Sequence, residues 1–214
     1  MRVIVFANGE IQNPKEILGF VDEMDILIAA NGGARHCLSL ALFPKLIIGD
    51  HDSLTEAEIQ TLEQGGAELQ QHPANKDETD LELALFKAKE FNPEEIIIFG
   101  ALGARWDMSV ANLLLLAHPG LKLTPIRIID GFDELSVLQS DQVKEIFAQP
   151  GDTISLIPLC GDAKGISTHG LEYPLEKGTL RFGATRGVSN VISENQAWIT
   201  LEEGLLLVVI IKDH

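Results

Sequence analysis

The chain has 214 residues, of which 45% are hydrophobic and 22% are charged, enough apolar content to bury a large core in one domain or two. Its 16 Lys and Arg stand against 32 Asp and Glu, a formal net charge of -16. This balance argues against sequence-independent binding to nucleic acid or to an anionic membrane. A polyphosphate would need local cations, either divalent metals held by carboxylates or a few well placed Lys and Arg.

The lengths of the apolar runs and the two isolated cysteines indicate in which cellular compartment the protein is expected. The run "GLLLVVII" near the C-terminus is far shorter than a membrane span, and "MRVIVFANGE" has only a few apolar residues before a Gly. We therefore expect no signal peptide, no transmembrane helix and a cytoplasmic protein. Cys37 and Cys160 lie far apart in apolar surroundings, which favours two buried free thiols in a reducing compartment.

In the first half of the chain, apolar runs alternate with helical patterns. Strands are predicted at "RVIVFA", "DILIAA", "KLIIGD" and "EEIIIFGA", with helical stretches at 13–24 and 55–66 between them. The spacing in "TDLELALFKAKEF" predicts an amphipathic helix capped by Thr79 or Asp80, and another helix begins near Asp107. This alternation predicts a parallel sheet covered by helices.

After about Leu121 the pattern changes to short strand candidates separated by Gly, Pro and Asp turns. They are "TPIRIIDG", "ELSVLQ", "DTISLIPL", "THGLEYPL", "GTLRFG", "SNVIS", "QAWITLE" and "GLLLVVII". The expected fold is α/β: an N-terminal three-layer parallel-sheet domain over 1–124, followed by a C-terminal antiparallel β-sandwich-like domain over 125–214.

Polar segments follow the predicted strands at "AANGGA", "IGDHDS" and "IFGALGARWD". Ligands of open α/β sheets bind outside the carboxyl ends of the strands, so all three segments are expected to line one crevice. Asp50 and Asp52, two apart on an extended segment, would both point into it, while His51 would point away and serve a supporting or structural role. Capping of the next helix explains Asp52 in part but not Asp50, and such carboxylates suit Mg²⁺.

A second acidic group, Asp77, Asp80 and Glu82 beside Lys76, stands at a helix start. Taken alone, favourable interaction with the helix dipole accounts for it. A helix N-terminus can equally hold phosphate oxygens and a metal, with Lys76 as a point charge. Together with the acids after the third strand, it favours a shared metal and phosphate site.

In the third segment, Gly100 and Gly103 would allow a phosphate to approach the backbone, with Arg105 and Asp107 beside the next helix. Without a ligand, the two glycines would be a chance G-x-x-G, and Arg105 and Asp107 would form an ordinary surface ion pair. Trp106 is a candidate for stacking on a ligand ring. Because no Walker A, G-x-G-x-x-G, C-x-x-C, H-E-x-x-H or G-x-S-x-G pattern occurs, zinc chemistry, nucleophile-elbow hydrolysis and the P-loop fold are disfavoured.

Four ordered motifs, 49–53, 76–82, 100–107 and Ser189-Asn190, together resemble the thiamine pyrophosphokinase family over essentially the whole chain. The resemblance implies an α/β catalytic domain followed by a β-sandwich-like domain. It also implies a homodimeric transferase that moves a pyrophosphoryl group from ATP to thiamine, giving thiamine diphosphate and AMP. A permanently cationic thiazolium suits an acidic protein.

Carried over by position, the resemblance assigns roles to the following residues. Mg²⁺ and the triphosphate would be surrounded by Asp50, Asp52, Asp77 and Asp80; phosphate charge would be offset by Lys76 and Arg105; further nucleotide contacts would come from Asn31, Gly32, Thr79 and Gly103; the acceptor would face Ser189 and Asn190 of the other subunit; and its hydroxyl proton would pass to Asp80 or Asp107.

Two motifs depart from the family pattern. The loop usually written Ala-Asp-Gly-Gly-Ala has Asn31 in place of the acid, and Gly-Gly-Arg-x-Asp-His has Ala104 and Met108 in place of a Gly and the His. Asn31 carries no charge, and Met108 cannot replace a histidine in hydrogen bonding. These changes leave open a pyrophosphokinase for another hydroxyalkyl acceptor, such as a reduced pterin. A non-catalytic nucleotide and metal sensor is a further alternative, and the retention of all four metal acids speaks against it.

Overall fold

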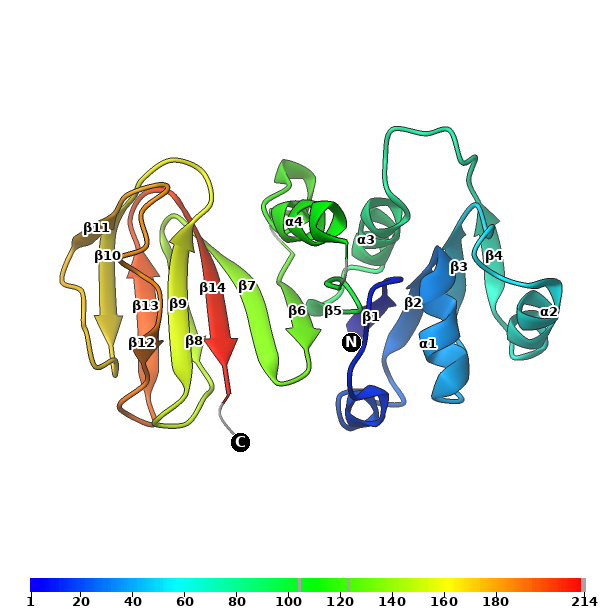
Figure 1. Ribbon diagram of the computed structural model, residues 1–214, viewed down its shortest axis with the longest axis horizontal. Coiled ribbons are helices and arrows are strands. Elements are labelled where there is room, and N and C mark those ends of the chain that lie inside the picture. The colour runs from blue at the N-terminus through cyan, green and yellow to red at the C-terminus, as the bar shows by residue number, and fades with distance from the viewer. Residues whose placement is uncertain (104, 123, 213–214) are drawn as a thin grey trace. The chain divides into compact units, whose positions relative to one another are not determined.

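A computed structural model describes residues 1–103, 105–122 and 124–212 and divides the chain into two compact units, Met1–Gly131 and Phe132–His214. The sequence placed the boundary at 124/125, seven residues earlier. The difference arises at β6 (Ile126–Asp130), which pairs in parallel with β5 (Glu95–Phe99) and therefore belongs to the first unit (Figure 1).

The described residues of the first unit form a six-stranded parallel sheet in the order β6-β5-β1-β2-β3-β4. Its remaining strands are β1 (Arg2–Phe6), β2 (Ile26–Ala30), β3 (Leu46–Gly49) and β4 (Glu68–Gln71). The central strands β1, β2, β3 and β5 are almost continuously buried, as expected where helices cover both faces of a parallel sheet.

In the described part of the first unit, four α-helices and three short 3-10 helices connect these strands. They are η1 (Pro14–Gly19), η2 (Asn31–Gly33), α1 (Ala34–Ser39), α2 (Glu56–Gln64), α3 (Asp80–Glu90), α4 (Trp106–Leu115) and η3 (Pro119–Leu121). Thr79 caps α3 by accepting a hydrogen bond from the Glu82 N–H, and Thr55 and Glu58 form a capping box on α2. None of the helices in the described ranges combines the length and apolar character needed to cross a membrane.

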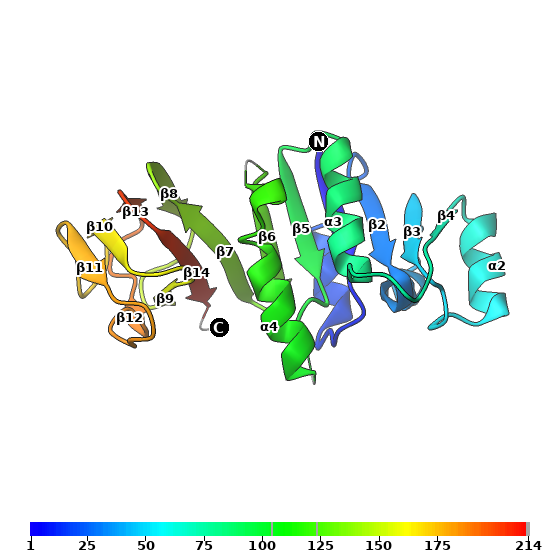
Figure 2. The same cartoon turned by 90° about the horizontal axis from the view of Figure 1, so that it is seen from above.

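The two faces of the parallel sheet bury different sets of side chains. Ile4, Phe6 and Ala29 face a cluster that includes Ile17 of η1 and Cys37 of α1. Helix α3 contacts β1, β2, β3 and β5 but contributes no side chain to that cluster, so it covers the opposite face, as the alternation along strands requires. Figure 2 shows α3 and α4 lying across that face. The predicted three-layer domain is confirmed.

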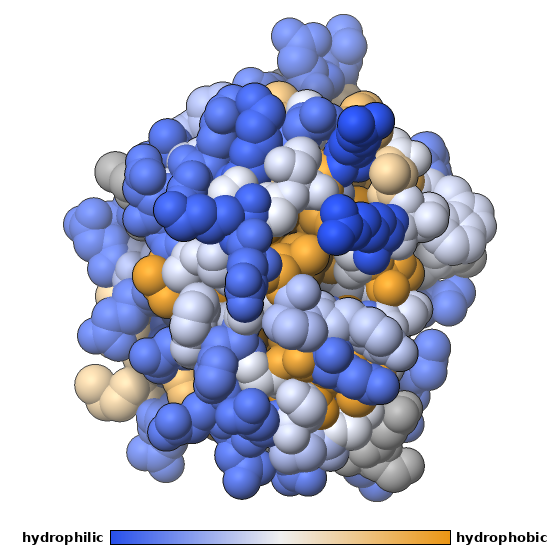
Figure 3. Space-filling model, turned by 90° about the vertical axis from the view of Figure 1, so that its left-hand side faces the viewer, coloured by the Kyte–Doolittle hydropathy of each residue, from blue (hydrophilic) through white to orange (hydrophobic). Residues whose placement is uncertain are grey.

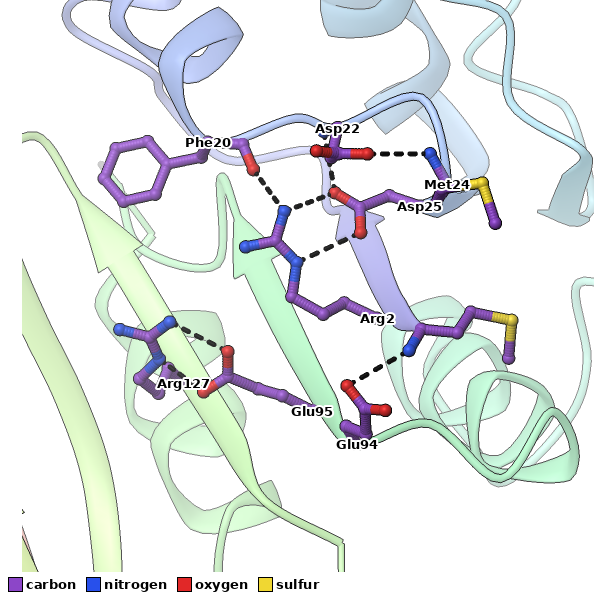
Figure 4. Close-up of polar contacts among 9 residues, drawn as sticks. Arg2, Phe20, Asp22, Met24, Asp25, Glu94, Glu95 and Arg127 are labelled. Atoms are coloured by element: carbon purple, nitrogen blue, oxygen red, sulfur yellow. Dashed lines mark hydrogen bonds and ion pairs between the residues drawn. The ribbon is translucent and has the colours of Figure 1, made fainter.

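The predicted helix over 13–24 is replaced by η1, a single 3-10 segment. Pro14 begins it and Gly19 ends it, and both residues restrict a longer helix. The following turn is held by Asp25, whose carboxylate accepts two hydrogen bonds from the Arg2 guanidinium, while Arg2 also donates to the Phe20 carbonyl oxygen (Figure 4). Although burial by itself raises the pKa of Asp25, the hydrogen bonds from Arg2 bring it below its ordinary value.

The second unit is a β-sandwich. One of its sheets has the order β12-β9-β14-β7 and the other the order β11-β10-β13-β8, with antiparallel pairing throughout. The strands are β7 (Asp133–Gln139), β8 (Gln142–Ile146), β9 (Thr153–Pro158), β10 (Ala163–His169), β11 (Gly178–Leu180), β12 (Asn190–Val191), β13 (Ala197–Leu201) and β14 (Leu205–Ile211). Side chains of both sheets share one apolar core, including Leu156, Ile199 and Val208. The predicted sandwich-like domain is confirmed.

The end of the second unit shown in Figure 3 is mostly polar, with small apolar areas between the polar ones. Cys160 lies in the exposed bend between β9 and β10, which corrects the prediction that both cysteines are buried. The apolar run before Cys160 is a buried strand that ends at Pro158, and the chain turns outward before Gly161. Cys37 is buried as predicted.

Candidate active site

A cleft of about 380 Å³ opens at the carboxyl end of the parallel sheet. It is lined by residues from the ends of β1, β2 and β5 and from the first turns of α3 and α4. They are Ala7, Asn8, Gly9, Glu10, Ala30, Asn31, Thr79, Asp80, Leu81, Gly100, Ala101, Leu102, Gly103, Arg105, Met108, Ser109 and Asn112. The predicted crevice is therefore present in the first unit with residues from the first and third polar segments, but residues 48–53 are not among those that line it.

The loop after β1 forms one wall of this cleft, and the sequence reasoning did not assign it a role. Gly9 donates its N–H to the Gly100 carbonyl oxygen at 2.7 Å, and Glu10 donates to Leu102 at 3.1 Å. A Cβ at Gly9 would collide with both carbonyl oxygens, so only glycine lets the loops after β1 and β5 come this close. The segment "FANGE" is polar after a buried strand, as the recognised segments are, and that signal could have identified it.

Three carboxylates from two elements converge on the amide nitrogen of Asn31. Nδ2 donates to Asp50 Oδ1 at 2.8 Å, to Asp52 Oδ1 at 3.1 Å and to Asp80 Oδ2 at 3.1 Å. Asn31 is buried, with 8% of its surface exposed, and its hydrogen bond lowers the pKa of the Asp52 carboxyl. The predicted convergence of Asp50, Asp52 and Asp80 is thus present in the structure.

Asp50 and Asp52 were predicted to converge because residues two apart on an extended segment point the same way, and this reason is wrong. The segment is not extended, because His51 has the left-handed φ of +61°. Gly49 precedes this turn because a Cβ there would lie 2.9 Å from Asn31 Cβ and 3.1 Å from Asp80 Cγ. The His51 ring is half-buried, which lowers its pKa, and neither ring nitrogen has a hydrogen-bond partner among the described residues.

Lys76 and Thr79 hold the start of α3 at the cluster. The Lys76 ammonium lies 2.8 Å from Asp80 Oδ1 and donates to the Pro73 carbonyl oxygen at 3.2 Å. Thr79 lines the cleft and caps α3. Asp77 is exposed, and no hydrogen bond found in the described part of the chain joins it to the three carboxylates.

The segment before α4 is divided between the cleft and solvent. Arg105 lines the cleft, and its guanidinium contacts the exposed Asp107 carboxylate through Nε and Nη2. This hydrogen bond lowers the pKa of Asp107. Trp106, the stacking candidate, is 80% exposed and does not line the cleft, whereas Trp198 in the second unit stacks on His169 at 5.6 Å. Ala104 lies outside the described residues.

Residues on α4 that the sequence reasoning did not assign complete the cleft wall. Asn112 donates to the Ala101 carbonyl oxygen at 2.6 Å, and the Gly103 N–H donates to the Ser109 hydroxyl at 3.2 Å. Gly103 has a φ of +157°, and Met108 lines the cleft beside it. These contacts fix the loop after β5, so the helix start and the strand end present one continuous wall. Their spacing of three to four residues along a helix is the signal that could have revealed them.

Ser189 and Asn190 lie in the second unit, just before and at the start of β12. Ser189 has the left-handed φ of +60°, and its N–H donates to the Ser155 hydroxyl at 3.0 Å. The Asn190 side-chain amide forms two hydrogen bonds with the backbone of Tyr173. It accepts from the Tyr173 N–H at 3.0 Å and donates to the Tyr173 carbonyl oxygen at 2.8 Å. The Asn190 side chain therefore holds the loop that carries the exposed Tyr173 ring.

The fold and the site define a two-domain α/β protein in which an acidic cluster with a neighbouring lysine borders a cleft that holds an arginine and closely packed glycine loops. Such a cleft suits a phosphorylated ligand that arrives with divalent cations, because the carboxylates alone would repel it.

Comparison with known proteins agrees with this class. The family model for "Thiamin pyrophosphokinase, catalytic domain" matches residues 19–129, and that for "Thiamin pyrophosphokinase, vitamin B1 binding domain" matches residues 140–206. The thiamine pyrophosphokinase of Bacillus subtilis (strain 168) is 30% identical over 206 residues, which cover 96% of each chain.

Solved structures of full length are similar as well. A crystal structure of thiamine pyrophosphokinase from Bacillus subtilis gives a TM-score of 0.89 at 28% identity, covering 100% of both chains. A thiamin pyrophosphokinase family protein from Enterococcus faecalis gives 0.85 at 26% identity, also over 100% of both. The chain belongs to the thiamine pyrophosphokinase family and is an enzyme of the transferase class.

Proposed function

We propose that this chain transfers a pyrophosphoryl group from ATP to the hydroxyl of thiamine, producing thiamine diphosphate and AMP. Membership of the family supports the reaction. The observation in the structure that carries the proposal is the convergence of Asp50, Asp52 and Asp80 on the Asn31 amide. Asn31, Asp80 and Arg105 all line the cleft. The retained acids of the cluster speak against a sensor without turnover.

The donor set fits Mg²⁺. Three carboxylates lie within hydrogen-bonding distance of the Asn31 amide nitrogen, and with the Lys76 ammonium beside Asp80 they leave a formal net charge of two negative. Carboxylate oxygens are the ligands that Mg²⁺ takes while keeping several waters. Among the described residues the acids surround the Asn31 amide, and no group of three or more His, Cys, Asp or Glu is preassembled around a metal position. We assign Mg²⁺ to Asp50, Asp52 and Asp80, with Asp77 entering when the nucleotide is bound.

The chain's own residues position the phosphates. Lys76, beside the carboxylate cluster, and Arg105, in the cleft wall, would offset phosphate charge. The backbone at Gly103, which lines the cleft, would allow close approach, whereas Gly32 is buried against the Asn8 side chain. Mg²⁺ would draw charge from the phosphate oxygens when it is bound. The acceptor hydroxyl attacks the β-phosphorus in line, the bond to the α-phosphate oxygen breaks and AMP leaves, so orientation and charge neutralisation supply most of the rate.

The hydroxyl proton passes to a carboxylate of the cleft. Asp107 is exposed and paired with Arg105, and its lowered pKa makes it a poor proton acceptor while that pair is intact. Asp80 lines the cleft, and we therefore assign the proton to Asp80, with Asp50 and Asp52 holding Mg²⁺ while the proton is transferred and Lys76 turning to the phosphates. Its position on the first turn of α3 places it between Lys76 and Asn31.

We also propose that the enzyme is a cytoplasmic homodimer in which Ser189 of one subunit faces the acceptor bound by the other. The left-handed backbone at Ser189 and the two hydrogen bonds between Asn190 and Tyr173 give a rigid, exposed loop, which a binding surface needs. Light scattering after gel filtration tests the dimer. A purely monomeric enzyme that makes product would exclude the role of Ser189 across subunits.

The first experiment incubates purified protein with ATP, Mg²⁺ and thiamine and measures AMP and thiamine diphosphate. We expect equal amounts of both, lost in Asp52→Asn and retained in the matched control Asp141→Asn, which changes an exposed turn acid whose left-handed φ asparagine also adopts. AMP without thiamine diphosphate would redirect the search to another hydroxyalkyl acceptor, with a reduced pterin tested next. The absence of both AMP and thiamine diphosphate would contradict the proposal.

A further inference from the structure

We infer that Asn31 is a positioning residue whose amide nitrogen takes the place of a cation among Asp50, Asp52 and Asp80 in the metal-free protein and must be displaced when a divalent cation binds. The inference rests on the cation site of the proposed function and adds a competitor for it. The chemistry concerned is that of any hard divalent cation.

The first support is the number of acceptors around one nitrogen. An amide nitrogen carries two hydrogens, yet three carboxylate oxygens lie 2.8, 3.1 and 3.1 Å from Asn31 Nδ2. At least one hydrogen is therefore shared between two acceptors. A group surrounded by more carboxylates than it has hydrogens occupies the position that a small cation would fill more favourably.

The second support is how the Asn31 amide is held. Its Oδ1 is buried and has no hydrogen-bond partner among the described residues, so only the nitrogen side fixes the orientation of the amide. The reverse orientation would turn an acceptor oxygen toward three acceptors, which excludes it in the metal-free state. No hydrogen bond on the oxygen side therefore resists displacement once a cation takes the carboxylates.

The third support is charge. An amide satisfies hydrogen bonds but neutralises nothing, and Lys76 compensates only one of the three carboxylates. The cluster is held at close range by Asn31 and by Gly49, whose missing side chain leaves room for both Asn31 and Asp80. The amide thus keeps the acids together at the cost of competing with the cation for their oxygens.

Two substitutions suit the left-handed φ of +46° at Asn31. Asn31→Gly removes the competing amide, and Asn31→Asp replaces it with a fourth carboxylate; glycine and aspartate both tolerate this backbone conformation. Because a net hydrogen bond corresponds to about a two- to tenfold change in an equilibrium constant, we expect Asn31→Gly to bind Mn²⁺ about two- to tenfold more tightly. We expect a gain of roughly tenfold or more for Asn31→Asp, since cation affinity rises with the number of charged ligands.

The experiment titrates each purified full-length protein with Mn²⁺ by calorimetry and measures the melting temperature in EDTA and in saturating Mn²⁺. Asn195→Asp, an exposed turn position in the second unit, controls for added negative charge. We expect Asn31→Asp to melt about 2–4 °C lower than the parent in EDTA, as repulsion among four acids replaces three hydrogen bonds, and to gain more from Mn²⁺ than the parent does. Asn195→Asp should match the parent in both measurements.

If Asn31 only supports the structure of the site, both variants should bind Mn²⁺ more weakly than the parent does, and that result would overturn the inference. Unchanged affinity in both variants, or no Mn²⁺ binding by the parent, would overturn it as well. The thiamine diphosphate assay separates this inference from the proposed function. If the parent enzyme makes thiamine diphosphate but neither variant binds Mn²⁺ more tightly than the parent does, only the competition is refuted. If both variants bind Mn²⁺ more tightly but the protein makes no thiamine diphosphate, the competition is supported and the proposed activity is refuted.

Discussion

The Lys76 ammonium lies 2.8 Å from Asp80 Oδ1, and the two side chains are only 12% and 23% exposed. The pair joins the loop before α3 to the first residue of that helix, at the edge of the carboxylate cluster. It therefore differs from the surface pairs of the chain, which are expected to contribute little.

Replacing Lys76 by methionine should reduce kcat/KM for thiamine diphosphate formation by about 10- to 100-fold, because a charge-assisted contact contributes roughly 1.5–3 kcal/mol. Steady-state kinetics with varied ATP measure the effect. The matched control is Lys87→Met within α3, which breaks an exposed pair with Glu90 and should leave kcat/KM unchanged. Equal kinetics in the two variants would remove Lys76 from phosphate binding.

Replacing Gly9 by alanine should destabilise the first unit by about 2–4 kcal/mol, because the new Cβ would collide with two backbone carbonyl oxygens that cannot move independently. Chemical denaturation monitors the change. Gly19→Ala serves as the control, since nothing lies within 4 Å of a Cβ there. If both variants unfold at the same denaturant concentration, the loops after β1 and β5 are not packed as described.

Replacing Glu58 by glutamine removes its ion pair with Arg35 but keeps the capping contact. Because the pair lies near the surface, its loss should destabilise the fold by only about 1 kcal/mol at pH 7. Arg35 and Thr55 lower the pKa of Glu58 to about 2. The folded pKa lies below the unfolded value, so the stabilisation is present above the unfolded pKa and is lost as the pH falls toward 2.

Urea denaturation of both proteins between pH 7 and pH 3 should therefore show a difference that shrinks below about pH 4. Glu63→Gln, at an exposed position of the same helix, should show little difference at any pH. A difference between Glu58→Gln and the parent that stays constant with pH would contradict the assigned ion pair.

The two cysteines should react with a thiol reagent at very different rates. Cys37 is buried, and burial raises the pKa of its thiol to about 12, so almost none is present as the reactive thiolate. The native protein should label once, at Cys160, and the denatured protein twice, as counted by mass spectrometry. Label found at Cys37 in the native protein, or a native Cys160→Ser variant that still labels rapidly, would contradict this burial.

Much of the fold could be predicted because it depends on local patterns. Continuous apolar runs such as 94–101 become buried parallel strands, and the spacing of apolar residues after Thr79 gives an amphipathic helix with its cap in place. The antiparallel second unit followed from short runs divided by turn residues. The exceptions are local too: residues 13–24 have helical spacing, but Pro14 and Gly19 confine the helix to a single 3-10 segment.

The site was predicted in part, because the sequence identifies acids after strand ends but not the contacts they make. It indicated that Asp50, Asp52, Asp77 and Asp80 would form one metal and phosphate site at the carboxyl edge of the sheet. The Asn31 amide joins three of these acids, but Asp77 is exposed. The sequence could not show that the Asn31 amide lies between them, that His51 turns the chain through a left-handed conformation, or that the loop after β1 forms a wall of the cleft. These features depend on backbone approach between segments distant in sequence, which only tertiary packing decides.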